Sequence, residues 1–235
     1  MNDSEPRPHP ALSASMLLCL AVGIASLVYG HVDAAARGLH PWENYLTEYM
    51  KAAPHWPWLV VACFAFALLL MLLAVALLWR SRPSLGAVLG CLLLAASSMG
   101  MFFIAYAPMR RMEQPPAPSH QWWTPTWWFT SHTARTPYED GMADAYEDVH
   151  YRATRLVVTC GVLAMLCLSL GMRRETKGSM FSTLTLVCGV GVGLLFFAAD
   201  QSTVLHGLWQ RLGFGLLVVW LVASWWRTSM LPHQS

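Results

Sequence analysis

Residues 57–79 read PWLVVACFAFALLLMLLAVALLW, an apolar run without a single charged side chain. About 20 consecutive apolar residues are enough for an α-helix to cross the hydrocarbon core of a bilayer. Lipid offers no hydrogen-bond partner to an open backbone, so a segment of this kind must be helical. The stretch therefore predicts a membrane-spanning helix.

Five further apolar runs of similar length lie on either side of this one along the chain. The six predicted helices lie near residues 11–30, 57–79, 85–107, 156–172, 180–199 and 205–226. They predict an all-α fold, a polytopic membrane helix bundle. We expect one transmembrane domain over 11–230 with short tails at 1–10 and 231–235, and a long Trp-rich connection at 108–155.

The composition agrees with a membrane protein and excludes several other classes. Hydrophobic residues make up 56% of the 235 residues and charged residues only 12%, whereas soluble domains carry about 25% charged residues. A formal net charge of +2 gives no indication of a nucleic-acid partner. The twelve Trp residues suit a protein with two membrane interfaces, so the predicted partner is the lipid bilayer.

The short connections between helices predict the orientation. Basic residues concentrate in short cytoplasmic loops, and two short connections are basic: Arg80 and Arg82 follow the second helix, and Arg173, Arg174 and Lys177 follow the fourth. We therefore expect both termini in the cytoplasm. The connections 31–56, 108–155 and 200–204 would then lie outside a cytoplasmic membrane.

Pairs of glycines four residues apart predict close helix packing. Gly86 and Gly90 lie in the third predicted helix, and Gly189 and Gly193 lie in the fifth. Small residues at this spacing let two backbones approach one another in a membrane.

Ionisable residues gather in the connections predicted to lie outside. Ten of the thirteen acidic residues lie on this side of the membrane, as do seven of the nine histidines when His206 at the start of the sixth helix is included. The helix interiors contain no acidic residue or histidine. Proton-coupled transporters place such residues at membrane depth, so this distribution argues against that class. It predicts a polar site at the outer face.

Several of these residues lie at helix ends, where the bundle fixes their positions. Neighbouring carboxylates and imidazoles supply acid–base groups near neutral pH. The candidate catalytic residues are Glu48, Asp148, His150 and His206. Asp200 closes the fifth helix, where the helix dipole disfavours a negative charge, so Arg211 is its predicted partner. Asp200, Gln210 and Arg211 are the candidate ligand-binding residues.

Four short motifs resemble a known family. They are Leu46-Thr47-Glu48-Tyr49 after the first helix, Pro108 at the end of the third, His150 at the head of the fourth, and Gly207-Leu208-Trp209-Gln210-Arg211 opening the sixth. Together they resemble the prokaryotic six-helix membrane family catalogued as domain of unknown function 998. The resemblance implies this topology but no established activity. Members often follow the Pro with an Asp, whereas this chain reads Ala107-Pro108-Met109-Arg110, which removes one carboxylate.

Three functional hypotheses follow, and the sequence does not decide whether the chain is an enzyme. The outer site binds or acts on a lipid-like ligand. Alternatively, the polar cluster is structural, in a non-catalytic accessory or assembly protein. The third hypothesis is haem or metal binding between His150 and His206, although no metal signature such as HExxH is present. The cofactor, if any, stays unknown.

Overall fold

The computed structural model describes residues 10–36, 56–80, 84–106, 141–173, 179–202 and 205–230. Within these ranges the backbone is almost entirely helical, which confirms the predicted all-α class. The six helices are α1 Pro10–Ala36, α2 Trp56–Arg80, α3 Leu85–Tyr106, α4 Gly141–Met172, α5 Ser179–Gln201 and α6 His206–Met230.

Each helix contains an apolar span of 22–24 residues. At about 1.5 Å per residue such a span is roughly 33–36 Å long, slightly more than the hydrocarbon thickness of about 30 Å. The chain is therefore a multi-pass integral membrane protein, as predicted.

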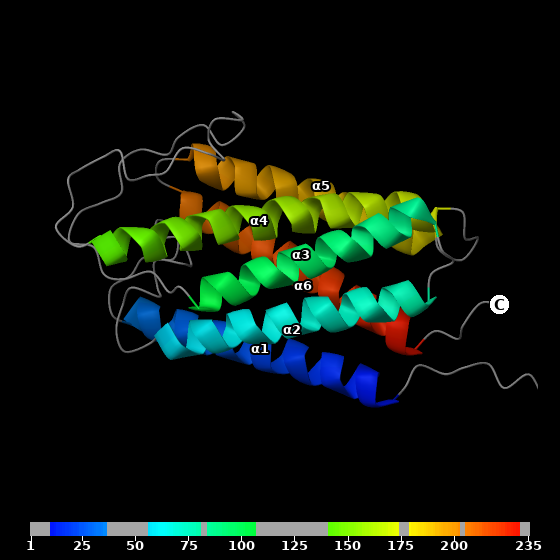
Figure 1. Cartoon of the computed structure of the whole chain (residues 1–235), viewed down its shortest axis with the longest axis horizontal. Helices are drawn as coiled ribbons and strands as arrows, with labels where there is room; N and C mark the ends of the chain where they lie inside the picture. The colour runs from blue at the N-terminus through cyan, green and yellow to red at the C-terminus, as the bar shows by residue number, and fades with distance from the viewer. Residues whose placement is uncertain are drawn as a thin grey trace, which may run out of the picture.

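The helices form a bundle in which successive helices run antiparallel and pack side by side (Figure 1). The last helix returns to the start of the chain, because α6 contacts both α1 and α2 as well as α5. The contact of α1 with α2 is much more extensive than its contact with α6, so α1 packs mainly against α2. The bundle thus closes around a central space lined by all six helices.

Glycines set the close packing of α4 against its neighbours, as their spacing predicted. A Cβ added at Gly90 of α3 would lie 2.6 Å from Leu168 Cγ of α4, and one at Gly86 would lie 2.9 Å from the Cys167 carbonyl oxygen. A Cβ at Gly189 of α5 would lie 3.0 Å from Met165 Cβ. Any larger side chain at Gly86 or Gly90 would push α3 away from α4.

Side-chain hydrogen bonds join five of the seven pairs of helices that are in contact. Each has a side-chain donor, and such bonds hold helices together where lipid cannot compete for the polar groups. They are Ser98 Oγ to the Ala67 carbonyl at 2.7 Å, Ser97 Oγ to the Val157 carbonyl at 3.0 Å, Ser182 Oγ to the Ser169 carbonyl at 2.6 Å, Trp220 Nε1 to Thr185 Oγ1 at 3.2 Å, and Trp225 Nε1 to the Ser13 carbonyl at 3.1 Å.

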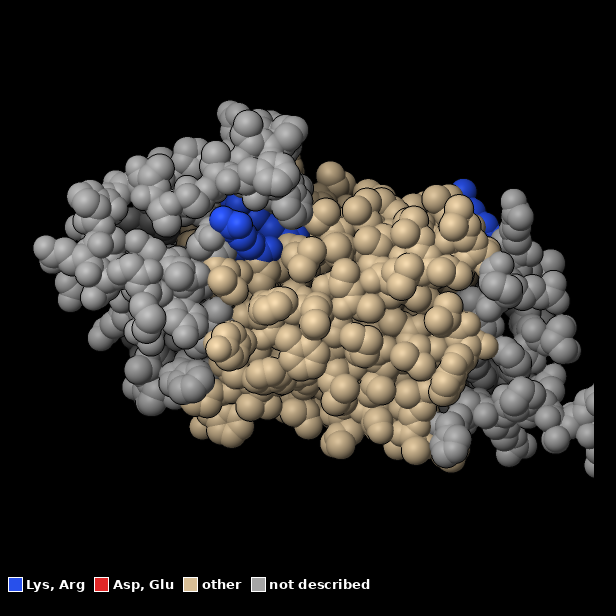
Figure 2. Space-filling view, in the orientation of Figure 1, with Lys and Arg blue, Asp and Glu red and all other residues tan. Residues whose placement is uncertain are grey.

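The outer surface marks the two membrane interfaces. Between the two ends of the bundle this face carries neither Lys, Arg, Asp nor Glu among the residues drawn in colour (Figure 2). Exposed aromatic rings lie at both ends of α2, at Trp58 and Trp79. Trp and Tyr settle at headgroup depth. Trp58 and Trp79 are 21 positions apart, which corresponds to about 31 Å of helix. This separation matches the hydrocarbon thickness of about 30 Å.

The fourth helix begins well before its apolar span. The span starts at Val149, but the helix starts at Gly141. The sequence predicted this helix near 156–172 and placed residues 108–155 in a connection, so the observed helix starts fifteen residues earlier than predicted. Helical hydrogen bonds do not stop where the apolar run stops, so hydropathy alone set the start too late.

Candidate functional site

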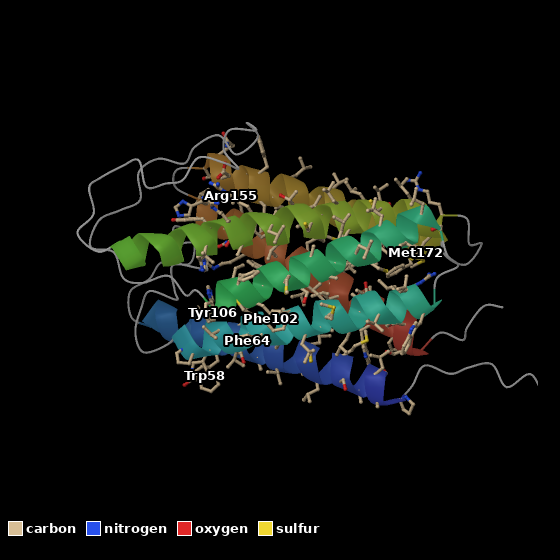
Figure 3. All side chains as sticks on the ribbon, in the orientation of Figure 1. Trp58, Phe64, Phe102, Tyr106, Arg155 and Met172 are labelled. Carbon is tan, nitrogen blue, oxygen red and sulfur yellow. The ribbon has the colours of Figure 1, made fainter. Side chains whose placement is uncertain are left out.

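One end of the bundle, here called the polar end, gathers most of the described ionisable side chains. It is the end where α1, α3 and α5 finish and where α2, α4 and α6 begin (Figure 1). Figure 3 shows Trp58, Tyr106 and Arg155 at this end and Met172 at the opposite one. The polar end comprises His31, His150, Thr154, Arg155, Asp200, His206, Gln210 and Arg211.

His150 lies inside the bundle rather than at the start of α4. It is nine residues from Gly141, where the helix begins, and only 1% of its surface is exposed. Its ring stands edge-on to that of Tyr151, with centroids 6.5 Å apart. One turn further along, Thr154 Oγ1 donates a hydrogen bond to the His150 carbonyl at 2.9 Å. The packing of α4 therefore fixes a buried imidazole and a hydroxyl on successive turns.

Asp200 is half-buried near the end of α5, and its charge interacts with that of Arg155 on α4. The neighbouring Gln201 donates from Nε2 to Asp200 Oδ2 at 3.2 Å. The sequence named Arg211 as the cation for Asp200, which stays a prediction, and did not indicate Arg155. Closeness along the chain favoured Arg211, whereas Arg155 approaches only because α4 packs beside α5.

Arg211 lies on α6 and turns back along its own helix. Its Nη1 donates to the Gly207 carbonyl at 2.9 Å, and its Nε and Nη2 atoms are buried. Its charge also acts on His31 of α1. Arg211 therefore places a positive charge where α6 meets α1.

A tight connection between α5 and α6 sets the positions of His206 and Gln210. Ser202 Oγ accepts a hydrogen bond from the Leu205 backbone N–H at 2.9 Å, which ties the end of α5 to the residue directly before α6. His206 is half-buried at the first position of α6, as predicted. Gln210, one turn later, is only 4% exposed and faces the interior of the bundle.

A cavity lies inside the bundle and extends from the polar end toward the middle of the helices. All six helices line it, through residues such as Leu27, Leu59, Met101, Met165, Val192 and Phe214. The space open to the centres of water-sized molecules is about 80 Å³. Thr154 and Gln210 are the polar-end members of a lining that is otherwise almost entirely apolar. No pattern in the sequence predicts this cavity, because its walls use the same residue types as an ordinary core.

Two candidate residues cannot be placed. Glu48 lies outside the described residues, and Asp148 belongs to α4 but its side chain is outside the described part. Among the described side chains, no group of three or more His, Cys, Asp and Glu residues could hold a metal ion. The pairing of His150 with His206 for a haem or metal stays a hypothesis.

The comparison with protein families agrees with this architecture. The model of a family described as "Protein of unknown function (DUF998)" matches residues 18–227, which include most of α1 and α6 and all of the other four helices. The chain belongs to this family. The polar end and the cavity both fall within the DUF998 match. No curated protein and no solved structure is similar enough to this chain to count as a match.

Proposed function

We propose that this protein binds an amphiphilic, lipid-like molecule, with the tail in the interior cavity and the head group at the polar end. The observation that supports this most is the position of the cavity. It is apolar along its length and meets Thr154 and Gln210 at the polar end. A ligand site of this kind combines apolar walls with a few polar groups that set orientation.

The polar end offers suitable chemistry for a head group. The Gln210 amide both donates and accepts hydrogen bonds, and the Thr154 hydroxyl oxygen can accept a hydrogen bond from a donor on the head group. Arg211 follows Gln210 in the chain and carries the positive charge that a phosphate or carboxylate would meet, with Asp200 and Arg155 at the same end. His150 and His206, with Glu48 and Asp148, remain the proposed acid–base groups if the ligand is a substrate.

The first test is a Thr154→Val substitution, which keeps the size of the side chain but removes the hydroxyl at the cavity. Lipids extracted from the protein purified in mild detergent are identified and counted by mass spectrometry. Losing one hydrogen bond costs about 0.5–1.5 kcal/mol, so we expect bound amphiphile to fall by roughly two- to tenfold.

Thr228→Val is the matched control. Thr228 Oγ1 also donates to the carbonyl four residues earlier, that of Ser224, at 2.9 Å, and Thr228 is also buried, but it lies near the opposite end of α6 and does not line the cavity. Equal occupancy in both variants and the parent would contradict the proposed head-group site.

A protein that retains no amphiphile would favour the structural hypothesis of an accessory protein. An absorption spectrum and elemental analysis of the same sample test the haem and metal hypothesis. A haem band that disappears in a His150→Ala and His206→Ala double variant would replace the lipid proposal with a cofactor site.

A further inference from the structure

We infer that the ligand carries a single hydrocarbon chain, as a fatty acid or a lysophospholipid does, rather than the two chains of a bilayer phospholipid. The inference rests on the proposed function and adds to it the class of ligand. It follows from the length, the width and the inner end of the cavity.

The length of the cavity corresponds to one leaflet. The lining extends from Thr154 to Met165 on α4 and from Gln210 to Leu221 on α6, eleven residues in each case. Eleven residues of helix rise about 16 Å, which is roughly half of the hydrocarbon thickness of about 30 Å. Leu59, at the polar end of the lining on α2, directly follows the interfacial Trp58. A hydrocarbon chain whose head group lies at the polar end would therefore reach the bilayer midplane and stop.

The width of the cavity corresponds to one chain. The volume open to the centres of water-sized spheres is about 80 Å³, which over about 16 Å of helix corresponds to a mean cross-section of about 5 Å² for those centres. With the sphere radius of about 1.4 Å added on each side, the mean opening is about 5 Å across, which admits one extended hydrocarbon chain. Two chains side by side would need at least twice this cross-section, so lining side chains such as Phe66, Met101 and Trp220 would have to move.

The lining of the cavity ends near the middle of the bundle. On α4 and α6 the lining residues furthest from the polar end are Met165 and Leu221, and Leu94 of α3 lines the same inner part. Protein interiors resist added volume, because extra methylene groups force neighbouring side chains out of their preferred positions. The cavity therefore limits the length of the chain as well as the number of chains.

The decisive comparison uses the unaltered protein and two lipids with the same head group. Palmitoyl lysophosphatidylcholine has one chain and dipalmitoyl phosphatidylcholine has two. Native mass spectrometry of the protein in detergent micelles reports the occupancy of each. We expect one bound lysolipid per protein, with the two-chain lipid weaker by about tenfold or more, because overpacking of this size is costly.

A cavity-filling variant locates the binding. Gly161 lines the cavity seven residues below Thr154, about 10 Å along the helix, and a Cβ there would contact only Ser97 Oγ, at 3.5 Å. Gly161→Leu should abolish binding of hexadecanoate but spare octanoate, whose chain ends before position 161. Gly215→Leu is the control, because a Cβ at Gly215 has no neighbour within 4 Å and the residue is exposed.

The outcomes separate the two proposals. If the two-chain lipid binds as well as the lysolipid and Gly161→Leu blocks both, the single-chain inference is overturned and the proposed function stands. If no lipid binds, or if binding is unchanged in Gly161→Leu, the cavity is not the site and both proposals fail. Loss of octanoate together with hexadecanoate in a variant that melts like the parent would overturn the limit on chain length.

Discussion

At the scale of single residues, Gly171 is a point where this fold tolerates no side chain. A Cβ there would lie 2.5 Å from the backbone nitrogen of Ala87 and 2.8 Å from Ser84 Oγ. Since the nearest atom belongs to the backbone, α3 must move to make room. We expect Gly171→Ala to lower the free energy of unfolding by about 1–3 kcal/mol, measured by thermal melting in detergent.

Gly215→Ala provides the control for this substitution. Both changes replace a helical glycine by alanine, which intrinsically favours the helix by about 1 kcal/mol, but nothing surrounds Gly215 within 4 Å. Its variant should melt at or above the temperature of the parent. If both variants melt alike, close packing between α3 and α4 is not what Gly171 provides.

At the scale of helices, the bond between Trp220 and Thr185 ties α6 to α5. Trp220 and Thr185 are both fully buried, and the indole N–H donates to Thr185 Oγ1 at 3.2 Å. Thr185→Val keeps the shape but leaves the indole N–H without this acceptor. Hydrogen bonds between membrane helices contribute about 0.6 kcal/mol on average and up to about 1.7, and we expect a loss of stability in that range.

A double-mutant cycle isolates this bond from the packing around it. Trp220→Phe removes the donor, so Thr185→Val should cost almost nothing further in the Trp220→Phe background. An equal cost of Thr185→Val in both backgrounds would show that the hydroxyl stabilises the protein in some other way.

At the scale of the whole molecule, the bundle places the starts of α1, α3 and α5 opposite the polar end (Figure 1). Pro10 and Met230 therefore lie at the same end of the described structure. We propose that this end faces the cytoplasm, since α2 and α4 finish there and the residues that follow them in the sequence are basic.

Reporter fusions test this orientation. Green fluorescent protein joined after the last residue should fluoresce, and alkaline phosphatase inserted between α3 and α4 should be active, because each reporter works on only one side of the membrane. The reverse pattern would place the polar end in the cytoplasm, and the ligand would then enter from the inner leaflet.

The sequence by itself determined the number of membrane helices and their approximate limits. The physical reason is that lipid imposes a local rule: every buried backbone group needs a partner within its own helix, so twenty apolar residues suffice to identify a span. A second local rule predicted that His206 and Asp200 lie at helix ends. Ionisable side chains are costly inside the lipid, so they are found in the sequence directly before or after an apolar span.

Only the tertiary structure decided which of these residues meet. Arg155 and Asp200 lie on different helices and approach through the packing of α4 against α5. The cavity depends on six helices leaving space between them, and no periodicity of Leu, Phe or Met distinguishes a wall from a filled core. Packing between helices depends on the shapes of all their side chains together, which no local stretch of sequence contains.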